Sequence, residues 1–184
     1  ILFLGFSLLI ILGDILISEE DSEFEYSYPF LLNLPMYINL PLLVLFLSMT
    51  ISLLSQSASQ NNLLFSYLNI NFNKIGQLYN LFDKVSLVAI SSLFIGIMGT
   101  VPGHELVHRK KNKFDMFMGN WLLSLSWDCA FALEHVYGHH KNVGLQTDPA
   151  TAKRGENIYA FILRAIVKEQ KDAWKIFLNQ NRKN

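Results

Sequence analysis

Long apolar blocks constrain this chain more than any other feature of its sequence. Three such blocks lie at about 1–18, 35–54 and 85–102, in a chain that is 51% hydrophobic and only 16% charged. A helix needs roughly 20 apolar residues to cross about 30 Å of hydrocarbon, and each block comes close to that length. The sequence therefore predicts an all-α integral membrane protein, with a bundle of transmembrane helices in one membrane domain over 1–184.

The basic residues gather in the second half of the chain. Only Lys74 and Lys84 precede Arg109, and the other lysines and arginines lie from Arg109 onward. The basic run 109–113 follows the third apolar block directly. Because lysine and arginine concentrate on the cytoplasmic side of membrane proteins, we expect this end of the third span to face the cytoplasm. A solvated charge run without topological meaning is the alternative.

All five histidines fall in two short windows. His104 and His108 lie in HELVH, and His135, His139 and His140 lie in EHVYGHH. Residues four apart share one face of a helix, so each window can direct paired imidazoles at one point. Imidazole is a good ligand for iron, zinc or copper. A lone histidine near a membrane is usually structural, but this grouping predicts that all five are metal ligands.

Two segments flank the second histidine window. The range 116–133 is apolar enough for a fourth span, yet Asp128 lies inside it and a charge is costly in lipid. A simple crossing would also separate the two histidine windows, so a shared site requires this segment to be re-entrant or interfacial. From about 149 to 179, apolar residues recur at helical spacing with lysines among them, after the start signal Asp148 and Pro149. This pattern predicts an amphipathic helix, either on a membrane surface or packed against another part of the protein.

The histidines alone leave two other interpretations open. HELVH alone fits the H-E-x-x-H pattern of zinc proteases, with Glu105 as general base, but that reading leaves the second window unexplained. A metal-binding structural or transport protein is a non-enzyme alternative, although transporters place ionisable groups near mid-membrane rather than at span ends. Cys129 is the single cysteine, so a cysteine-based zinc site is excluded, and no motif indicates a nucleotide or nucleic-acid partner.

The two windows and the sequence after them resemble the AlkB-type alkane monooxygenases, within the membrane fatty-acid desaturase and hydroxylase superfamily. The first two motifs of that family are H-E-L-x-H and E-H-x-x-G-H-H, matched here by His104, Glu105, Leu106 and His108, and by Glu134, His135, Gly138, His139 and His140. The next two are D-P-A-S/T and G-E-x-x-Y-x-F-x-x-R, matched by Asp148, Pro149, Ala150 and Thr151, and by Gly155, Glu156, Tyr159, Phe161 and Arg164. The resemblance is firm from about Gly103 to Arg164.

The resemblance implies a non-haem di-iron monooxygenase that uses O₂ and reductant to hydroxylate an unactivated C–H bond, with a terminal methyl of an alkane or similar hydrophobe as the expected target. It implies two iron ions with the five histidines among their ligands, a substrate that arrives from the bilayer, and a rubredoxin-like or ferredoxin-like electron donor. A fatty-acyl desaturase of the same superfamily is the alternative. The spacing from His135 to His139 is one residue longer than in the usual desaturase box, which favours the hydroxylase.

The resemblance also indicates what lies around and beyond the ligands. Glu105, Glu134 and Asp148 are candidate carboxylates that contact the metal or orient imidazoles, while Tyr159 and Arg164 are expected to support the site or to pack. The family's two later histidine motifs are not in this sequence, and the chain starts inside an apolar run. We therefore expect a piece of a longer protein that cannot complete the di-iron centre alone. Gly144 to Thr147 replace a common Thr-Pro of the family, so substrate preference is expected to differ.

Overall fold

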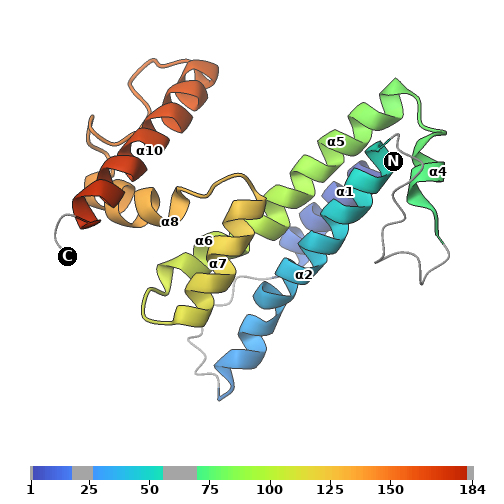
Figure 1. Cartoon of the computed structure of the whole chain (residues 1–184), viewed down its shortest axis with the longest axis horizontal. Helices are drawn as coiled ribbons and strands as arrows, with labels where there is room; N and C mark the ends of the chain where they lie inside the picture. The colour runs from blue at the N-terminus through green and yellow to red at the C-terminus, as the bar shows by residue number, and fades with distance from the viewer. Residues whose placement is uncertain (1, 18–26, 56–69, 182–184) are drawn as a thin grey trace. The chain divides into compact units, whose positions relative to one another are not determined.

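The computed structural model describes residues 2–17, 27–55 and 70–181, and within these ranges all regular structure is helical. Up to residue 100 the helices are α1 (Leu2–Leu16), α2 (Pro29–Leu54), α4 (Phe72–Gly76), α5 (Leu81–Ile95) and η1 (Gly96–Thr100). From residue 101 they are α6 (Val101–His108), α7 (Lys113–Leu125), α8 (Phe131–Glu134), η2 (His135–His139), α9 (His140–Asn142) and α10 (Ile158–Asn181) (Figure 1). The chain divides into two compact units, Ile1–Leu32 and Asn33–Asn184, and the second holds all five histidines. The predicted all-α class is confirmed.

Two helices are long and apolar enough to cross a membrane. They are Phe30–Leu54 in α2 and the continuous helix Leu81–His108, which α5, η1 and α6 form together. Most of their apolar side chains are exposed in the structure, as suits helices surrounded by hydrocarbon. The predicted spans 35–54 and 85–102 fall within these helices. Helix α1 occupies most of the predicted span 1–18, and residues 1 and 18 lie outside the described part.

Glycines let α6 pack closely on α7. A Cβ atom on Gly119 would lie 3.0 Å from the carbonyl oxygen of Gly103, and a Cβ atom on Gly103 would lie 3.2 Å from the carbonyl oxygen of Gly119. Small residues permit this approach because nothing projects between the two backbones. The core beside this contact joins α2, α6 and α7 and contains Tyr37, Leu43, Leu106, Met118 and Leu122. Helices α6 and α7 lie next to each other in Figure 1.

The range 116–133 is divided rather than forming one helix. Helix α7 ends at Leu125, where Asp128 N–H donates to Leu123 O and Trp127 N–H donates to Ser124 O. In this helix-closing motif Trp127 adopts a left-handed conformation with φ 64°, which stops the helix. The 13 residues of α7 span about 20 Å, too short for a simple crossing. Whether the range is re-entrant or interfacial stays a prediction.

The helix expected from residue 149 begins only at Ile158, so its predicted start was wrong. Asp148 does not cap a helix; its carboxylate accepts hydrogen bonds from Ala150 N–H and Thr151 Oγ1, and these bonds turn the chain. Gly155 then adopts φ 75°, a left-handed conformation that glycine adopts without strain. Helix α10 packs on α8 and η2, with Ala165 and Ala173 buried.

Candidate metal centre

The first histidine window lies at the end of a candidate membrane-spanning helix. His104 and His108 are one turn apart in α6, and their ring centroids are 4.8 Å apart. Just before them, η1 is a π-helical turn closed by a hydrogen bond from Val101 N–H to Gly96 O. Such turns are rare and often accompany functional sites. Both imidazoles therefore project from one face of a rigid helix.

A second π-helical turn forms the other window. In η2, His140 N–H donates to His135 O, a hydrogen bond that spans five residues instead of four. Because a π-turn places residues i and i+5 on one face, His135 and His140 point to the same place, and their Nε2 atoms are 3.0 Å apart. The extra residue between His135 and His139 is thus accommodated by a wider helical turn.

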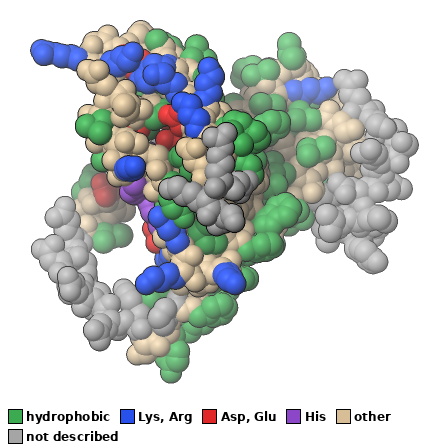
Figure 2. All heavy atoms as spheres, turned by 60° about the vertical axis from the view of Figure 1, so that its left-hand side comes forward, with side chains coloured by type: hydrophobic (Ala, Val, Ile, Leu, Met, Phe, Trp, Pro, Cys, Tyr) green, Lys and Arg blue, Asp and Glu red, His purple; other side chains and the backbone are tan. Residues whose placement is uncertain are grey.

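The two windows converge, as a shared site requires. One ring nitrogen from each of His104, His108 and His135 lies within 4.8 Å of the others. The ring of His140 is 4.9 Å from that of His108 and its Nε2 is 3.0 Å from His135 Nε2, so a fourth predicted ligand borders this group of three. Part of this cluster reaches the surface near acidic and basic side chains (Figure 2).

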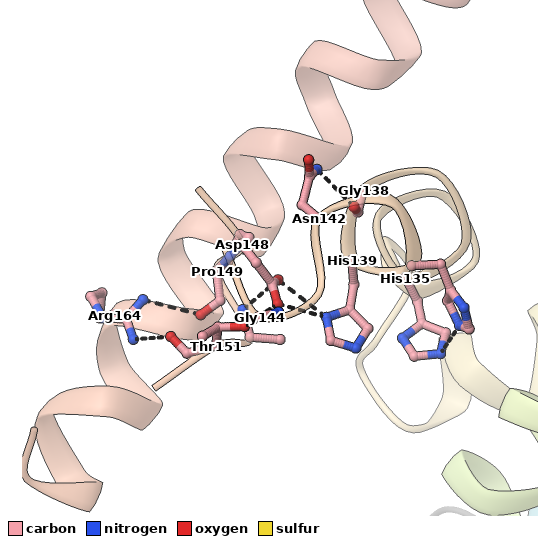
Figure 3. Close-up of polar contacts among 11 residues, drawn as sticks. His135, Gly138, His139, Asn142, Gly144, Asp148, Pro149, Thr151 and Arg164 are labelled. Carbon is pink, nitrogen blue, oxygen red and sulfur yellow. Dashed lines mark hydrogen bonds and ion pairs between the residues drawn. The ribbon is translucent and has the colours of Figure 1, made fainter. Parts of the chain in front are cut away.

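His139 takes a different position within the same window. Its ring stacks against that of His135 at 5.2 Å, and its Nδ1 lies 3.0 Å from Asp148 Oδ2. Figure 3 shows the ring of His139 between Asp148 and His135. A carboxylate bonded to one ring nitrogen leaves the other available as a ligand, which is the usual arrangement around histidine-bound metals.

The chemistry of this donor set fits a metal ion. Burial, followed by the neighbouring histidines, lowers the pKa of His135 to about 4, so this imidazole is neutral at physiological pH. Neutral imidazole is the form that binds metals, and an all-nitrogen set suits iron, zinc or copper. The residues present can therefore hold a transition metal.

The predicted carboxylates differ in their surroundings. Glu105 is 56% exposed and forms an ion pair with Arg109 at 3.0 Å. Glu134 is only 4% exposed; its Oε1 has no hydrogen-bond partner among the described residues, and burial, followed by Glu169, raises its pKa to about 7. Gly138 makes room for this carboxyl, because a Cβ there would lie 2.6 Å from Glu134 Oε1. Asp148 is 1% exposed and receives hydrogen bonds from three groups, His139 among them.

Sequence reasoning missed two neighbours of the cluster. Phe131 stacks on His135 at 4.3 Å and meets the edge of His104 at 5.1 Å, forming an apolar wall. An aromatic residue four positions before a ligand histidine was the available signal. Asn142 donates to Gly138 O and supports the end of the π-turn. Tyr159, considered as a supporting residue, is exposed, whereas Arg164 is engaged in a network near Asp148.

Comparison with known proteins places this arrangement in a family. Residues 84–184 match the family described as fatty acid desaturase. Alkane 1-monooxygenase 1 of Alcanivorax borkumensis is 40% identical over 87 residues, 47% of this chain and 21% of that protein. Alkane 1-monooxygenase of Pseudomonas putida is 40% identical over 93 residues, 50% of this chain and 23% of that protein.

These matches reach only about a fifth to a quarter of each relative's length. No solved structure matches the chain. The family match nevertheless covers more than half of the 184 residues and includes both histidine windows. The chain belongs to the fatty acid desaturase family.

Proposed function

We propose that this protein is a membrane oxidoreductase that hydroxylates an alkane or a similar hydrophobic molecule, with the histidine cluster as part of a non-haem di-iron site. One observation carries the proposal: histidines from two separate windows converge on one point. The relatives named alkane 1-monooxygenase support an alkane substrate and attack at its terminal carbon.

Iron held by these imidazoles would supply the activation of O₂. The overall reaction takes O₂, two electrons and two protons, inserts one oxygen atom into a C–H bond and releases the other as water. The chain contributes neutral nitrogen ligands, and Asp148 beside His139 supplies negative charge near them. Phe131, which contacts the rings of His104 and His135, would shield one side of these histidines from water.

The substrate would reach the site from the bilayer. His104 and His108 lie at the end of the apolar helix Leu81–His108, whose exposed side chains include Val88 and Phe94. A molecule dissolved in hydrocarbon can approach along such a surface without entering water.

Two other outcomes compete at the same site. The family description favours desaturation of a fatty acyl chain, whereas the names of the relatives favour hydroxylation. A zinc protease would need Glu105 as general base, but its carboxylate is engaged with Arg109 on the exposed side of α6.

Metal analysis of the purified full-length protein tests the site. We expect about two irons per chain, with a large loss in His135→Ala and in His140→Ala and none in Gln146→Ala, an exposed polar residue of the same region. A single zinc retained in both histidine variants would contradict the proposal.

Product analysis under ¹⁸O₂ separates the two oxidations. A hydroxylase yields an alcohol that carries ¹⁸O, while a desaturase yields a carbon–carbon double bond without the label. An unlabelled unsaturated product would replace the hydroxylase by the desaturase.

We also propose that an acidic redox protein, rubredoxin-like or ferredoxin-like, delivers electrons at the basic turn 109–113, on the cytoplasmic face of a bacterial inner membrane. A shallow, open hollow of about 460 Å³ lies here, lined by His108, Arg109, Lys110, Lys111, Asn112 and Asp115. Opposite charges speed such encounters most at low salt. Lys111→Glu should slow electron delivery at low ionic strength and Lys168→Glu on α10 should not; equal rates in wild type and Lys111→Glu would count against this docking face.

A further inference from the structure

A chain of hydrogen bonds begins at Glu156 and Arg164 and ends at His139 in the second histidine window. It passes through the loop 143–157, which joins α9 to α10 and carries Asp148 (the Asp148 loop). We propose that Arg164, together with Glu156, is a positioning residue for His139, acting through Asp148. This inference rests on the proposed metal-binding function and adds a role for an ion pair well outside the cluster.

The contacts begin on α10. Arg164 Nε donates to Glu156 Oε1 at 2.6 Å, and Arg164 Nη2 donates to Glu156 Oε2 at 2.7 Å. This bidentate ion pair fixes the plane of the guanidinium, and a lysine ammonium cannot form such a pair. The arginine holds the pKa of Glu156 at about 2, so the pair stays charged at any physiological pH. Lys153 N–H also donates to Glu156 Oε2, which anchors the carboxylate to its own loop.

The fixed guanidinium then binds the backbone just after Asp148. Its Nη1 donates to Pro149 O and its Nη2 to Thr151 O, both at 3.1 Å (Figure 3). Pro149 and Thr151 lie in a segment without regular secondary structure, so these two bonds tie that segment to α10. Arg164 therefore determines where the backbone that carries Asp148 lies.

Asp148 passes this placement on to His139. Its carboxylate accepts hydrogen bonds from Ala150 N–H and Thr151 Oγ1, which orient it, and from His139 Nδ1 at 3.0 Å. An ionised carboxylate only accepts hydrogen bonds, so Nδ1 must be the protonated nitrogen and Nε2 carries the lone pair. If the loop moved, His139 would lose both its orientation and its preferred tautomer.

The test is a double-mutant cycle on metal affinity in the full-length protein. Cobalt(II) is titrated into metal-free protein against a chelator, and its visible absorption reports binding without any turnover. Residues that hydrogen-bond directly to a ligand histidine change metal affinity by roughly 10- to 100-fold, and Arg164 acts one contact further away. We expect Arg164→Lys to weaken binding about 10-fold, and to change it less than about 2-fold when His139→Ala is already present. Arg154→Lys, the same substitution at an exposed arginine of the same loop, should leave affinity unchanged.

The outcomes separate this inference from the proposed function. If wild-type protein binds no metal, the proposed function fails. If it binds metal but Arg164→Lys weakens binding equally with and without His139, Arg164 is structural only and the positioning role is overturned. If Arg164→Lys does not fold, Glu156→Gln in the same cycle takes its place: a loss of affinity that depends on His139 supports the role, and unchanged affinity overturns it.

Discussion

The two histidine windows meet at one site but are supported by different forces. The first window lies in α6, where Leu106 and Val107 are fully buried and the helix packs on α7 through facing glycines. The second lies in a short π-turn, and hydrogen bonds from the Asp148 loop and Asn142 support it. Apolar packing positions one half of the site, and a polar network positions the other.

This difference predicts how each half fails. Close packing leaves no unfilled space, so a small added group at the α6–α7 contact should lower the stability of these helices. A hydrogen-bond network orients side chains, so a small change in the second window should lower metal affinity while the helices stay folded. A variant of either window that behaves in the opposite way would show that the two windows are not supported differently.

The largest effect is expected where the helices are closest. In Gly119→Ala, the new Cβ would lie 2.9 Å from Val107 Cγ1 and 3.0 Å from Gly103 O, so α6 and α7 must separate. Overpacking of this kind costs about 1–3 kcal/mol in free energy of unfolding, measurable by SDS titration in mixed micelles. Gly96→Ala is the matched control, because a Cβ there meets nothing within 4 Å. Equal losses in both variants would show that the close contact does not hold the first window.

A smaller effect, and of another kind, is expected from Asp148→Asn. The amide keeps the shape of the side chain but removes the charge that faces His139 Nδ1, so metal affinity should fall about 10-fold. The free energy of unfolding of the metal-free protein should change much less than in Gly119→Ala. Asp172→Asn, whose carboxylate binds Lys175, should leave metal affinity near the wild-type value. A stability loss without an affinity loss would contradict the polar role of the second window.

The sequence predicted which histidines come together better than it predicted what supports them. Helical periodicity places His104 and His108 on one face, and the same rule brought the second window into the prediction. It could not show the π-turn that aligns His135 with His140, because that turn depends on backbone hydrogen bonds rather than on residue type. Helix α10 was expected too early, since Asp148 and Pro149 equally suit a helix start and a tight turn.

Long-range contacts were also beyond the sequence. Leu106 looked like an ordinary apolar residue of its motif, yet it is fully buried in a core that joins α2, α6 and α7. Arg164 and Glu156 were visible only as parts of a motif. Their bonds to Pro149 and Thr151 depend on how the loop folds back on α10. Such contacts follow from tertiary packing and leave no periodic signal.

The smallest predicted effect concerns the pH dependence of stability near the second window. Burial, followed by Asp128 and Asp148, raises the pKa of Glu169 on α10 above its ordinary value of 4.5. The folded protein therefore holds this proton more tightly than the unfolded chain does, and its stability falls as pH rises through the raised pKa. Glu169→Gln should raise the thermal midpoint of the metal-free protein at pH 7.5 and leave it nearly unchanged at pH 4. Gln170→Ala, next to it on α10, should shift the midpoint by the same amount at both pH values. If the Glu169→Gln shift is also independent of pH, ionisation of Glu169 does not lower the stability of the folded protein. The contrast between the two windows would then rest on packing and hydrogen bonds alone.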